Sequence, residues 1–428
     1  MNTDSSSRGA APSAGSTPPD AADPDQAEPA TSTPAQQGWY LSGVGAWFAA
    51  FGIQAVVFPW ITTFLLHESA ERIGLAQAAL WLPLLAFLLV GGALADRVDP
   101  RRVLIVLHLV ALLPPAAVAI LELAGALAYW PIIAYGLAMG TVMAFLQPSR
   151  DALLSRVAGG RIQRMVMMAT ALQFGTQLCG TLAAGLTGIL GLIPVLGAQA
   201  LMLGFGAFSA SRLRPAPPAA DRREPALAAI LAGLRLVWQD PMLRTVVAMG
   251  TFIGLFYVGG FVVILPVLVR EFYGSGEHFA AFYAVWAAGN VATLLALLRL
   301  GMLAHPGRAL LLAMLASSVC MLVASATPAA PWIYLLMAIW GGVAGISASM
   351  SRTIVQQLAP HRHRARVLAT FQLGFFGSVP VGAFLGGLLV GAVGSAQAMW
   401  AAPVCILPLT LWVLAGRRIW AYRPPTGS

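Results

Sequence analysis

The sequence contains no lysine and little charge of either sign. Its 428 residues include 25 Arg and 16 Asp or Glu, so that only 10% are charged, whereas 58% are hydrophobic. A mean hydropathy of +0.78 is far above that of soluble globular proteins. Without lysine the chain cannot form the Gly-x-x-x-x-Gly-Lys phosphate-binding loop, which excludes an ATPase motor within this chain.

Groups for enzymatic or metal chemistry are equally scarce. The three cysteines, at 179, 320 and 405, fall inside predicted helices, which excludes a disulfide framework or a metal knuckle. His108 stands alone, and the other five histidines lie in loops or at their margins. The "HRHR" cluster at 361–364 could bind a metal, but a solvated basic loop explains it better. We therefore expect neither an enzyme nor a bound metal or cofactor.

Long uncharged runs fill most of the chain. A membrane-crossing helix needs about 20 apolar residues, and the runs 165–211, 309–351 and 367–416 are each long enough for two, with Gly- or Pro-containing breaks at 191–194, 327–331 and 391–397. Backbone groups in lipid require helices. Twelve spans are predicted, at about 39–66, 75–95, 103–122, 128–149, 165–190, 192–211, 245–268, 279–299, 309–327, 331–351, 367–392 and 397–416.

The arginines predict the orientation. With a cytoplasmic amino terminus, 23 of the 25 fall in cytoplasmic segments, and only Arg72 and Arg270 lie outside. The positive-inside rule then places both termini in the cytoplasm. The net charge of +9 therefore reflects topology, and we expect no nucleic-acid partner.

The spans divide into two sets of six. Residues 1–37 lack Leu, Ile, Val and aromatic residues and are expected to form a disordered cytoplasmic tail. A six-helix bundle at 38–211, a linker at 212–244, a second bundle at 245–416 and a tail at 417–428 follow. In the linker, Leu227, Ile230, Leu231, Leu234 and Trp238 have the spacing of an amphipathic helix on the inner surface, although a plain connecting helix fits as well.

A weak internal repeat supports this division. A shift of 202 residues aligns Ser149–Arg150 with Ser351–Arg352 and Arg164 with Arg366. It also aligns Gly180 with Gly382 and Gly185 with Gly387. Matched halves of this kind are common in secondary transporters.

The charged stretch "GGALADRVDPRRVLI" between spans 2 and 3 carries a more specific signal. It resembles the loop pattern Gly-x-Leu-Ala-Asp-Arg-x-Gly-Arg-Arg of the major facilitator superfamily, which it departs from at Asp99 and Pro100. "FLQPSRDALLSRV" at 145–157 and "VQQLAPHRHRARV" at 355–367 further resemble the branch of enterobactin-type siderophore exporters and macrolide efflux proteins. The resemblance covers about residues 39–416. It implies an all-α fold of two pseudo-symmetric six-helix bundles, working as a monomer.

In that family the loop closes the cytoplasmic side of the outward-open state. The resemblance implies that Asp96 approaches residues 365–368 and pairs with Arg150. An acid at such a position can accept from the amino end of a helix, where the dipole favours an anion. The predicted latch consists of Gly92, Asp96, Arg97, Arg101, Arg150 and Arg366. Topology alone explains Arg101 well but Asp96 poorly, and the counterpart at 297–312 has no acid.

Polar and aromatic side chains in the spans predict a wide, mostly neutral cavity. Polar groups in a membrane are costly and usually face a cavity, although each of these residues could equally serve helix packing. The candidates are Phe51, Gln54, Phe58, Gln173, Gln177, Thr251, Tyr257, Trp286, Asn290, Trp340, Ser347, Gln372 and Phe376. Such a lining suits a medium-sized amphipathic organic solute.

No carboxylate lies in the middle of a predicted span. Proton antiport requires an acid whose proton affinity changes between states, and Glu122, Asp151 and Asp96 are the candidates. The expected function is proton-coupled export of a siderophore or drug-like solute across a bacterial-type inner membrane. A lysophospholipid flippase of the same fold and a non-transporting scaffold remain alternatives, whereas a channel would need charge rings or filter loops.

Overall fold

The structure is a computed structural model that describes residues 33–159, 161–215, 226–301, 303–329, 331–360 and 363–422. Of residues 88–97, 226, 227, 229, 230, 300 and 365 it describes the backbone alone. Within these ranges the regular structure is helical throughout.

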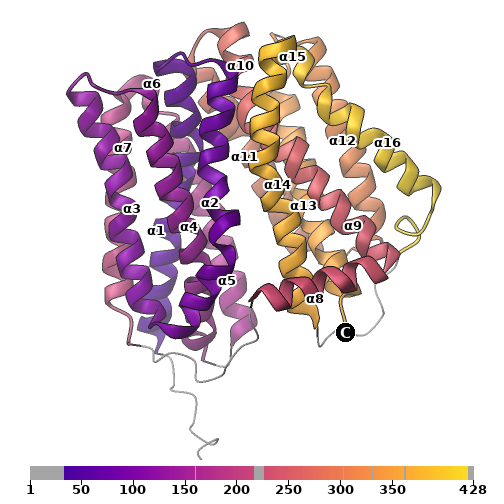
Figure 1. Ribbon diagram of the computed structural model, residues 1–428, viewed down its shortest axis with the longest axis horizontal. Coiled ribbons are helices and arrows are strands. Elements are labelled where there is room, and N and C mark those ends of the chain that lie inside the picture. The colour runs from indigo at the N-terminus through magenta and orange to yellow at the C-terminus, as the bar shows by residue number, and fades with distance from the viewer. Residues whose placement is uncertain are drawn as a thin grey trace, which may run out of the picture.

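The first half begins with α1 (Pro34–Trp60), which continues as the π-helical turn η2 (Ile61–Leu65). It then contains α2 (Ala70–Arg97), α3 (Pro100–Leu123), α4 (Tyr129–Val157), α5 (Ile162–Ala184), the single turn α6 (Thr187–Leu190) and α7 (Leu192–Ser211). In Figure 1 these helices form one group, coloured indigo to magenta.

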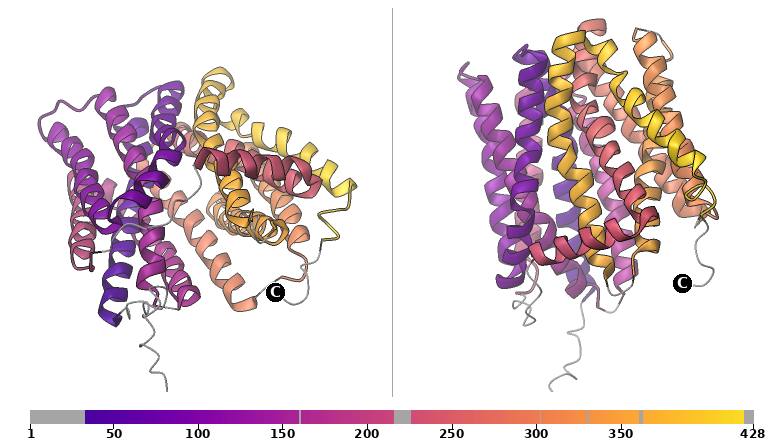
Figure 2. Two further views of the ribbon diagram at one scale, coloured as in Figure 1. Left: turned by 60° about the horizontal axis from the view of Figure 1, so that its bottom comes forward. Right: turned by 45° about the vertical axis from the view of Figure 1, so that its right-hand side comes forward.

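The second half follows the linker helix α8 (Ala226–Gln239). Its first rod combines α9 (Pro241–Phe252), the π-helical segment η3 (Ile253–Gly259) and α10 (Phe261–Tyr273). The others are α11 (Gly276–Leu300), α12 (Pro306–Ala326), α13 (Ile333–Leu358), α14 (Arg364–Val393), and α15 (Ser395–Ala398) with α16 (Ala401–Ala415). Figure 2 shows the two halves from two further directions.

Ten helices of the described chain are long and apolar enough to cross a membrane. The two other rods are α2, with 28 residues, and α5, with 23. In α5 the polar side chains of Gln173, Thr176 and Gln177 lower the hydropathy, and part of α2 has no described side chains. The predicted two bundles of six helices are confirmed, and the protein is a multi-pass membrane protein.

The breaks predicted inside the three longest apolar runs are also confirmed. Gly191, with φ 83°, separates α6 from α7, and Gly394, with φ 86°, separates α14 from α15. Only glycine adopts such backbone conformations readily. The third break separates α12 from α13 at the predicted "TPAAP" segment.

The first helix begins at Pro34, inside the segment predicted as tail. Thr33 caps it by accepting a hydrogen bond from the backbone N–H of Gln36 through its side chain, and proline fits the first helical position. Residues 1–32 lie outside the described chain. Four residues of the predicted tail, 34–37, therefore belong to the first span.

Within each half two helices cross where each places a glycine against the backbone of the other. Where α1 meets α5, a methyl group added at Gly52 would lie 2.1 Å from the carbonyl oxygen of Gln177. On the other side of the same crossing, a methyl group at Gly180 would lie 2.0 Å from the carbonyl oxygen of Ala49. Neither distance is possible for a real side chain, so the two backbones approach as only glycine allows.

The second half repeats this crossing between the π-helical segment η3 and α14. A methyl group at Gly254 would lie 2.1 Å from the carbonyl oxygen of Phe375, and one at Gly382 would lie 1.9 Å from that of Leu255. The 202-residue shift that aligns Gly180 with Gly382 also aligns Gly52 with Gly254. The sequence repeat thus corresponds to a repeated packing contact.

In each half, an arginine in the first turn of the third helix donates a hydrogen bond to the chain near the end of that half. Arg101 Nη2 donates to the carbonyl oxygen of Ser211 at 2.6 Å, and Arg308 Nε donates to that of Trp420 at 3.3 Å. Ile419 is buried beside Gly307. Residues 417–422 of the predicted tail therefore pack onto the second half.

The linker helix α8 is confirmed and lies across one end of the rods (Figure 1). Gly233 faces α14, where an added methyl group would lie 2.5 Å from the carbonyl oxygen of Arg366. Leu231, Leu234 and Trp238, on the other side, are exposed. Three residues of the predicted apolar stripe therefore face away from the bundle, whereas Val237 is buried against it.

Replacing Gly180 or Gly382 by alanine is expected to destabilise the protein by about 2 kcal/mol or more, because overpacking forces the backbones apart. Gly175→Ala on α5 is the matched control, since no atom lies within 4 Å of the added methyl group. Thermal unfolding in detergent, followed by size-exclusion chromatography, should show a lower melting temperature for Gly180→Ala and Gly382→Ala only. Equal melting temperatures for all three variants would contradict the crossings.

Candidate functional site: the seam between the two halves

We call the end of the bundle that carries residues 66–69 and 274–275 the outer end, following the orientation that the arginines predict. The halves meet along α2 with α14 and along α5 with α11. Midway along this seam, the ring of Trp81 stacks on that of Phe376, with centroids 6.2 Å apart and planes 11° apart. The aromatic pair joins the halves without any polar bond.

At the outer end the seam is closed by another reciprocal glycine contact. A methyl group at Gly74 would lie 2.7 Å from the carbonyl oxygen of Ala383, and one at Gly387 would lie 2.6 Å from that of Ala70. Here α2 of one half and α14 of the other touch backbone to backbone. The 202-residue shift aligns Gly387 with Gly185 in sequence, but it does not predict the contact of Gly387 with α2 across the seam.

Arg270 adds polar bonds to this closure. Its Nη1 donates to the carbonyl oxygen of Thr63 at 3.2 Å and to that of Glu68 at 2.8 Å, both in the other half. The Glu68 carboxylate itself pairs with Arg72 at 2.8 Å within the first half. Arg270 was noticed in the sequence only as one of two outer arginines, because its partners lie about 200 residues away.

Most of the predicted cavity residues lie in spans next to the seam. Eight of them are partly or fully exposed: Phe51, Gln173, Gln177, Thr251, Trp286, Asn290, Gln372 and Phe376. They come from α1, α5, α9, α11 and α14. As a set they combine neutral amides with aromatic rings, the composition that was predicted for the solute cavity.

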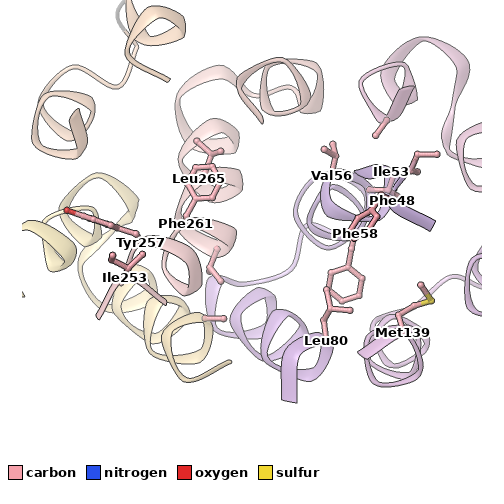
Figure 3. Packing of buried hydrophobic residues seen from close by; sticks show 14 of the residues in the cluster. Phe48, Ile53, Val56, Phe58, Leu80, Met139, Ile253, Tyr257, Phe261 and Leu265 are labelled. Carbon is pink, nitrogen blue, oxygen red and sulfur yellow. The ribbon is translucent and has the colours of Figure 1, made fainter. Parts of the chain in front are cut away.

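The other five predicted cavity residues are buried inside their own halves. Phe58 packs against Tyr135 with ring centroids 5.5 Å apart, and Trp340 packs against Phe261 at 4.9 Å. Figure 3 shows Phe58 and Tyr257 within the hydrophobic clusters of their halves. A solute cannot reach such buried side chains in this conformation. Sequence placed them in the cavity because helical spacing does not tell which face of a helix meets its neighbours.

Polar members of this buried group differ in their hydrogen bonding. Tyr257 is bonded to Ser318, 2.7 Å away, and Ser347 donates to the carbonyl oxygen of Val343 at 3.0 Å. The side-chain amide of Gln54 is 1% exposed and has no hydrogen-bond partner among the described residues. An unpaired buried amide is costly, so Gln54 is the one buried candidate for which a further partner is needed.

At the inner end, α4 carries a chain of polar side chains. Gln147 Nε2 donates to both oxygens of Asp151, at 3.1 and 3.4 Å, while Gln147 Oε1 accepts from Arg150 Nη2. The Arg150 guanidinium lies over the ring of Phe48, 4.6 Å from its centroid. Sequence analysis missed Gln147, although its spacing of four residues from Asp151 on one helix was a usable signal.

Asp151 faces the other half. It is exposed, and two cations act on its carboxylate electrostatically, Arg150 of its own helix and, more weakly, Arg352 of α13. The described structure shows no ion pair between Asp151 and Arg352. Glu122, by contrast, lies at the outer end of α3, a helix that packs on α4 and α7 of its own half. The Asp96 side chain lies outside the described residues.

The predicted latch is only partly described. Of Gly92, Asp96 and Arg97 only the backbone is described, so their contacts stay a prediction. Arg101 and Arg150 bind partners within the first half, as given above. Arg366 lies beside His363, with Nη1 and Nδ1 3.3 Å apart. Among the described residues, no group of three His, Cys, Asp or Glu could hold a metal ion.

Curated proteins of known name resemble this chain along most of its length. It is 28% identical to the multidrug efflux pump Tap of Mycolicibacterium fortuitum, over 81% of this chain and 87% of that protein. It is 26% identical to the enterobactin exporter EntS of Shigella boydii serotype 18, over 88% of this chain and 91% of that protein.

Among solved structures, the nucleoside transporter NupG superposes with a TM-score of 0.70 at 12% identity, covering 91% of this chain and 100% of that one. This likeness concerns the fold. The sequence model of the Major Facilitator Superfamily matches residues 41–382, which is most of the chain. The glycine-crossed halves, the seam between them and this match lead to one conclusion: the chain belongs to the major facilitator superfamily and is a membrane transporter rather than an enzyme.

Proposed function

We propose that this transporter exports a medium-sized amphipathic organic solute, siderophore or drug-like, by alternating access coupled to protons. The observation that carries the proposal is the seam, closed at the outer end by Gly74, Gly387 and Arg270. Two relatives with this direction of transport in their names, a multidrug efflux pump and an enterobactin exporter, support export.

Five partly or fully exposed side chains on the seam helices support an amphipathic solute. Gln173, Gln177 and Gln372 offer amide donors and acceptors, and Trp286 and Phe376 offer aromatic surface. Binding sites for organic molecules are mostly apolar with a few polar groups that fix orientation. None of these five side chains carries a charge, so a solute would be recognised by shape, stacking and neutral hydrogen bonds.

Asp151 is the acid we propose for proton coupling. It faces Arg352 across the inner end of the seam and is held by Gln147, so its surroundings change when the halves move. A carboxylate is more easily protonated when a nearby cation moves away. In the outward-open state Asp151 and Arg352 would form an ion pair, and in the inward-facing state they would separate.

The proposed topology follows from the arginines. Both termini would lie in the cytoplasm of a bacterial-type inner membrane, with Arg72 and Arg270 on the outer face. The carboxylate of Glu68 then neutralises Arg72, and the carbonyl groups at Thr63 and Glu68 hold Arg270. Arg72 is therefore paired within its own half and Arg270 is bonded across the seam, consistent with a bias against unpaired positive charge there.

Purified transporter reconstituted in proteoliposomes should move a catecholate siderophore such as enterobactin, or a macrolide such as erythromycin, when a pH gradient is applied. A lysophospholipid should compete weakly, because the five side chains that support the proposal carry no charge to pair with its phosphate. Flux of the lysophospholipid alone would establish a flippase instead. Absence of flux for all three probes would support a scaffold.

The Asp151→Asn variant is expected to lose proton-driven uptake into everted vesicles while still binding solute. Asparagine keeps the size of the side chain and can still accept from Gln147, but it cannot exchange a proton at neutral pH. Glu122→Gln is the matched control and should transport normally. Coupled uptake by Asp151→Asn at the rate of the unaltered protein would rule out Asp151 as the coupling acid.

The Arg270→Gln variant is expected to favour opening at the outer end. Hydrogen bonds to a charged group contribute roughly 1.5–3 kcal/mol each, so losing the two bonds should shift the equilibrium on the order of a hundredfold or more. Spin labels at Leu123 and Leu335, both exposed at the outer end, would report a longer distance by double electron–electron resonance. The native Cys179, Cys320 and Cys405 are first replaced by alanine.

Arg72→Gln provides the control for Arg270. Its pair with Glu68 lies within the first half, and the Arg72 side chain is about half-exposed, so the pair does not join the two halves. Its removal should leave the label distance unchanged. If Arg270→Gln also leaves the distance unchanged, the outer closure does not depend on this side chain.

A further inference from the structure

A small pocket lies inside the first half, between α1, α3, α4 and α7, away from the seam. Its volume is about 20 Å³, and its walls include Tyr40, Trp47, His108, Arg150 and Gly206. A cavity of this size holds one water molecule when polar partners are present. Two of the polar groups at its wall have no partner among the described residues, and these two carry the inference.

The first of these groups is the Nε2 atom of His108. The side chain is 3% exposed, and its Nδ1 lies 2.8 Å from the carbonyl oxygen of Leu104. Because a carbonyl oxygen only accepts, Nδ1 carries the hydrogen and the neutral ring presents a lone pair at Nε2. That lone pair is buried and unpaired. His108 therefore lacks a donor.

The second group is Nη1 of Arg150, whose side chain is 7% exposed. The other terminal nitrogen, Nη2, donates to Gln147, and the guanidinium lies over the ring of Phe48. Nη1 has N–H groups and no acceptor in the described structure. Arg150 therefore lacks an acceptor at the same pocket where His108 lacks a donor.

A water molecule can make both missing hydrogen bonds, because it can accept from Arg150 and donate to His108. An anion can only accept from Arg150, since the lone pair of a neutral imidazole would repel it. The surrounding elements contribute no acid to the pocket wall: α1 contributes Tyr40, whose hydroxyl donates to the Arg150 carbonyl oxygen at 3.3 Å, and α7 contributes Gly206 and Ala210. The unpaired donor and the unpaired acceptor at the pocket wall therefore favour a water molecule over an anion.

We propose that this pocket binds one water molecule that donates to His108 Nε2 and accepts from Arg150 Nη1. His108 is thereby a positioning residue, because the water fixes the guanidinium that holds Gln147, and Gln147 holds Asp151. The link to transport rests on the coupling role proposed above for Asp151, whereas the water site itself does not. A histidine that stands alone in the sequence is thus connected to the inner end of the seam.

Gly206 determines whether the pocket has room for the ring and the water. A methyl group added there would lie 2.3 Å from Cδ2 and 2.5 Å from Nε2 of His108. The imidazole would have to move, and its Nε2 would leave the pocket. Gly204, two residues earlier on the same helix, has no atom within 4 Å of an added methyl group. The two glycines form a matched pair for testing the site.

Solid-state NMR of the full chain in lipid bilayers, with ¹⁵N-labelled histidine, tests the water site directly. The His108 signals, assigned by their loss in His108→Gln, should show a neutral ring protonated at Nδ1 and a cross-peak from Nε2 to water. Gly204→Ala should keep this cross-peak and Gly206→Ala should lose it. A ring protonated at Nε2, or a wild-type ring without water contact, would overturn the site.

Transport tests the positioning role separately. His108→Leu removes the acceptor and should reduce proton-driven uptake severalfold with an altered pH profile, whereas His108→Gln, which keeps an acceptor near Nε2, should restore the wild-type profile. If Asp151→Asn loses coupling but His108→Leu has a wild-type profile, His108 has no positioning role. If Asp151→Asn transports normally, the coupling proposal fails, and the NMR result still decides the water site.

Discussion

The close approach of helix backbones at paired glycines is the constraint on which the rest of the structure depends. At the α1–α5 crossing and at its counterpart between η3 and α14, each glycine faces a carbonyl oxygen at a distance that leaves no room for a side chain. Backbones packed this closely resist continuous deformation. In our proposal each half therefore moves as a unit, and access changes at the seam.

The seam is built from contacts that can separate. At its outer end the glycine contact between α2 and α14 is looser than those within the halves, with 2.6–2.7 Å to the facing carbonyl oxygens. Arg270 binds carbonyl groups, which accept hydrogen bonds at any pH. Two acids also lie at the outer end, Glu71 against Gly391 and Glu277 against Gly188, each packed on a glycine of the other half. In our account the titratable carboxylate that responds to the motion is at the opposite end, beside Arg352.

The sequence was sufficient for the number of spans, the three glycine or proline breaks, the linker helix and the family, because these depend on local hydropathy, turn chemistry and one loop pattern. It was insufficient wherever the burial or the hydrogen bonds of a side chain depend on a residue far away in the sequence. The burial of Phe58 and Trp340 follows from Tyr135 and Phe261, the bonds of Arg270 from residues 63 and 68, and the surroundings of His108 from Arg150. Helical spacing gives a face for each residue but not the neighbour that covers it.

The central claim is that two rigid halves rock about the seam, so that one end opens as the other closes. Distances measured by double electron–electron resonance at both ends of the same protein test it most directly, with one label pair at Leu123 and Leu335 and another at Ser155 and Leu298. Lowering the pH on the outer side should lengthen one distance and shorten the other. Distances that change in the same direction at both ends, or at neither, would contradict the account.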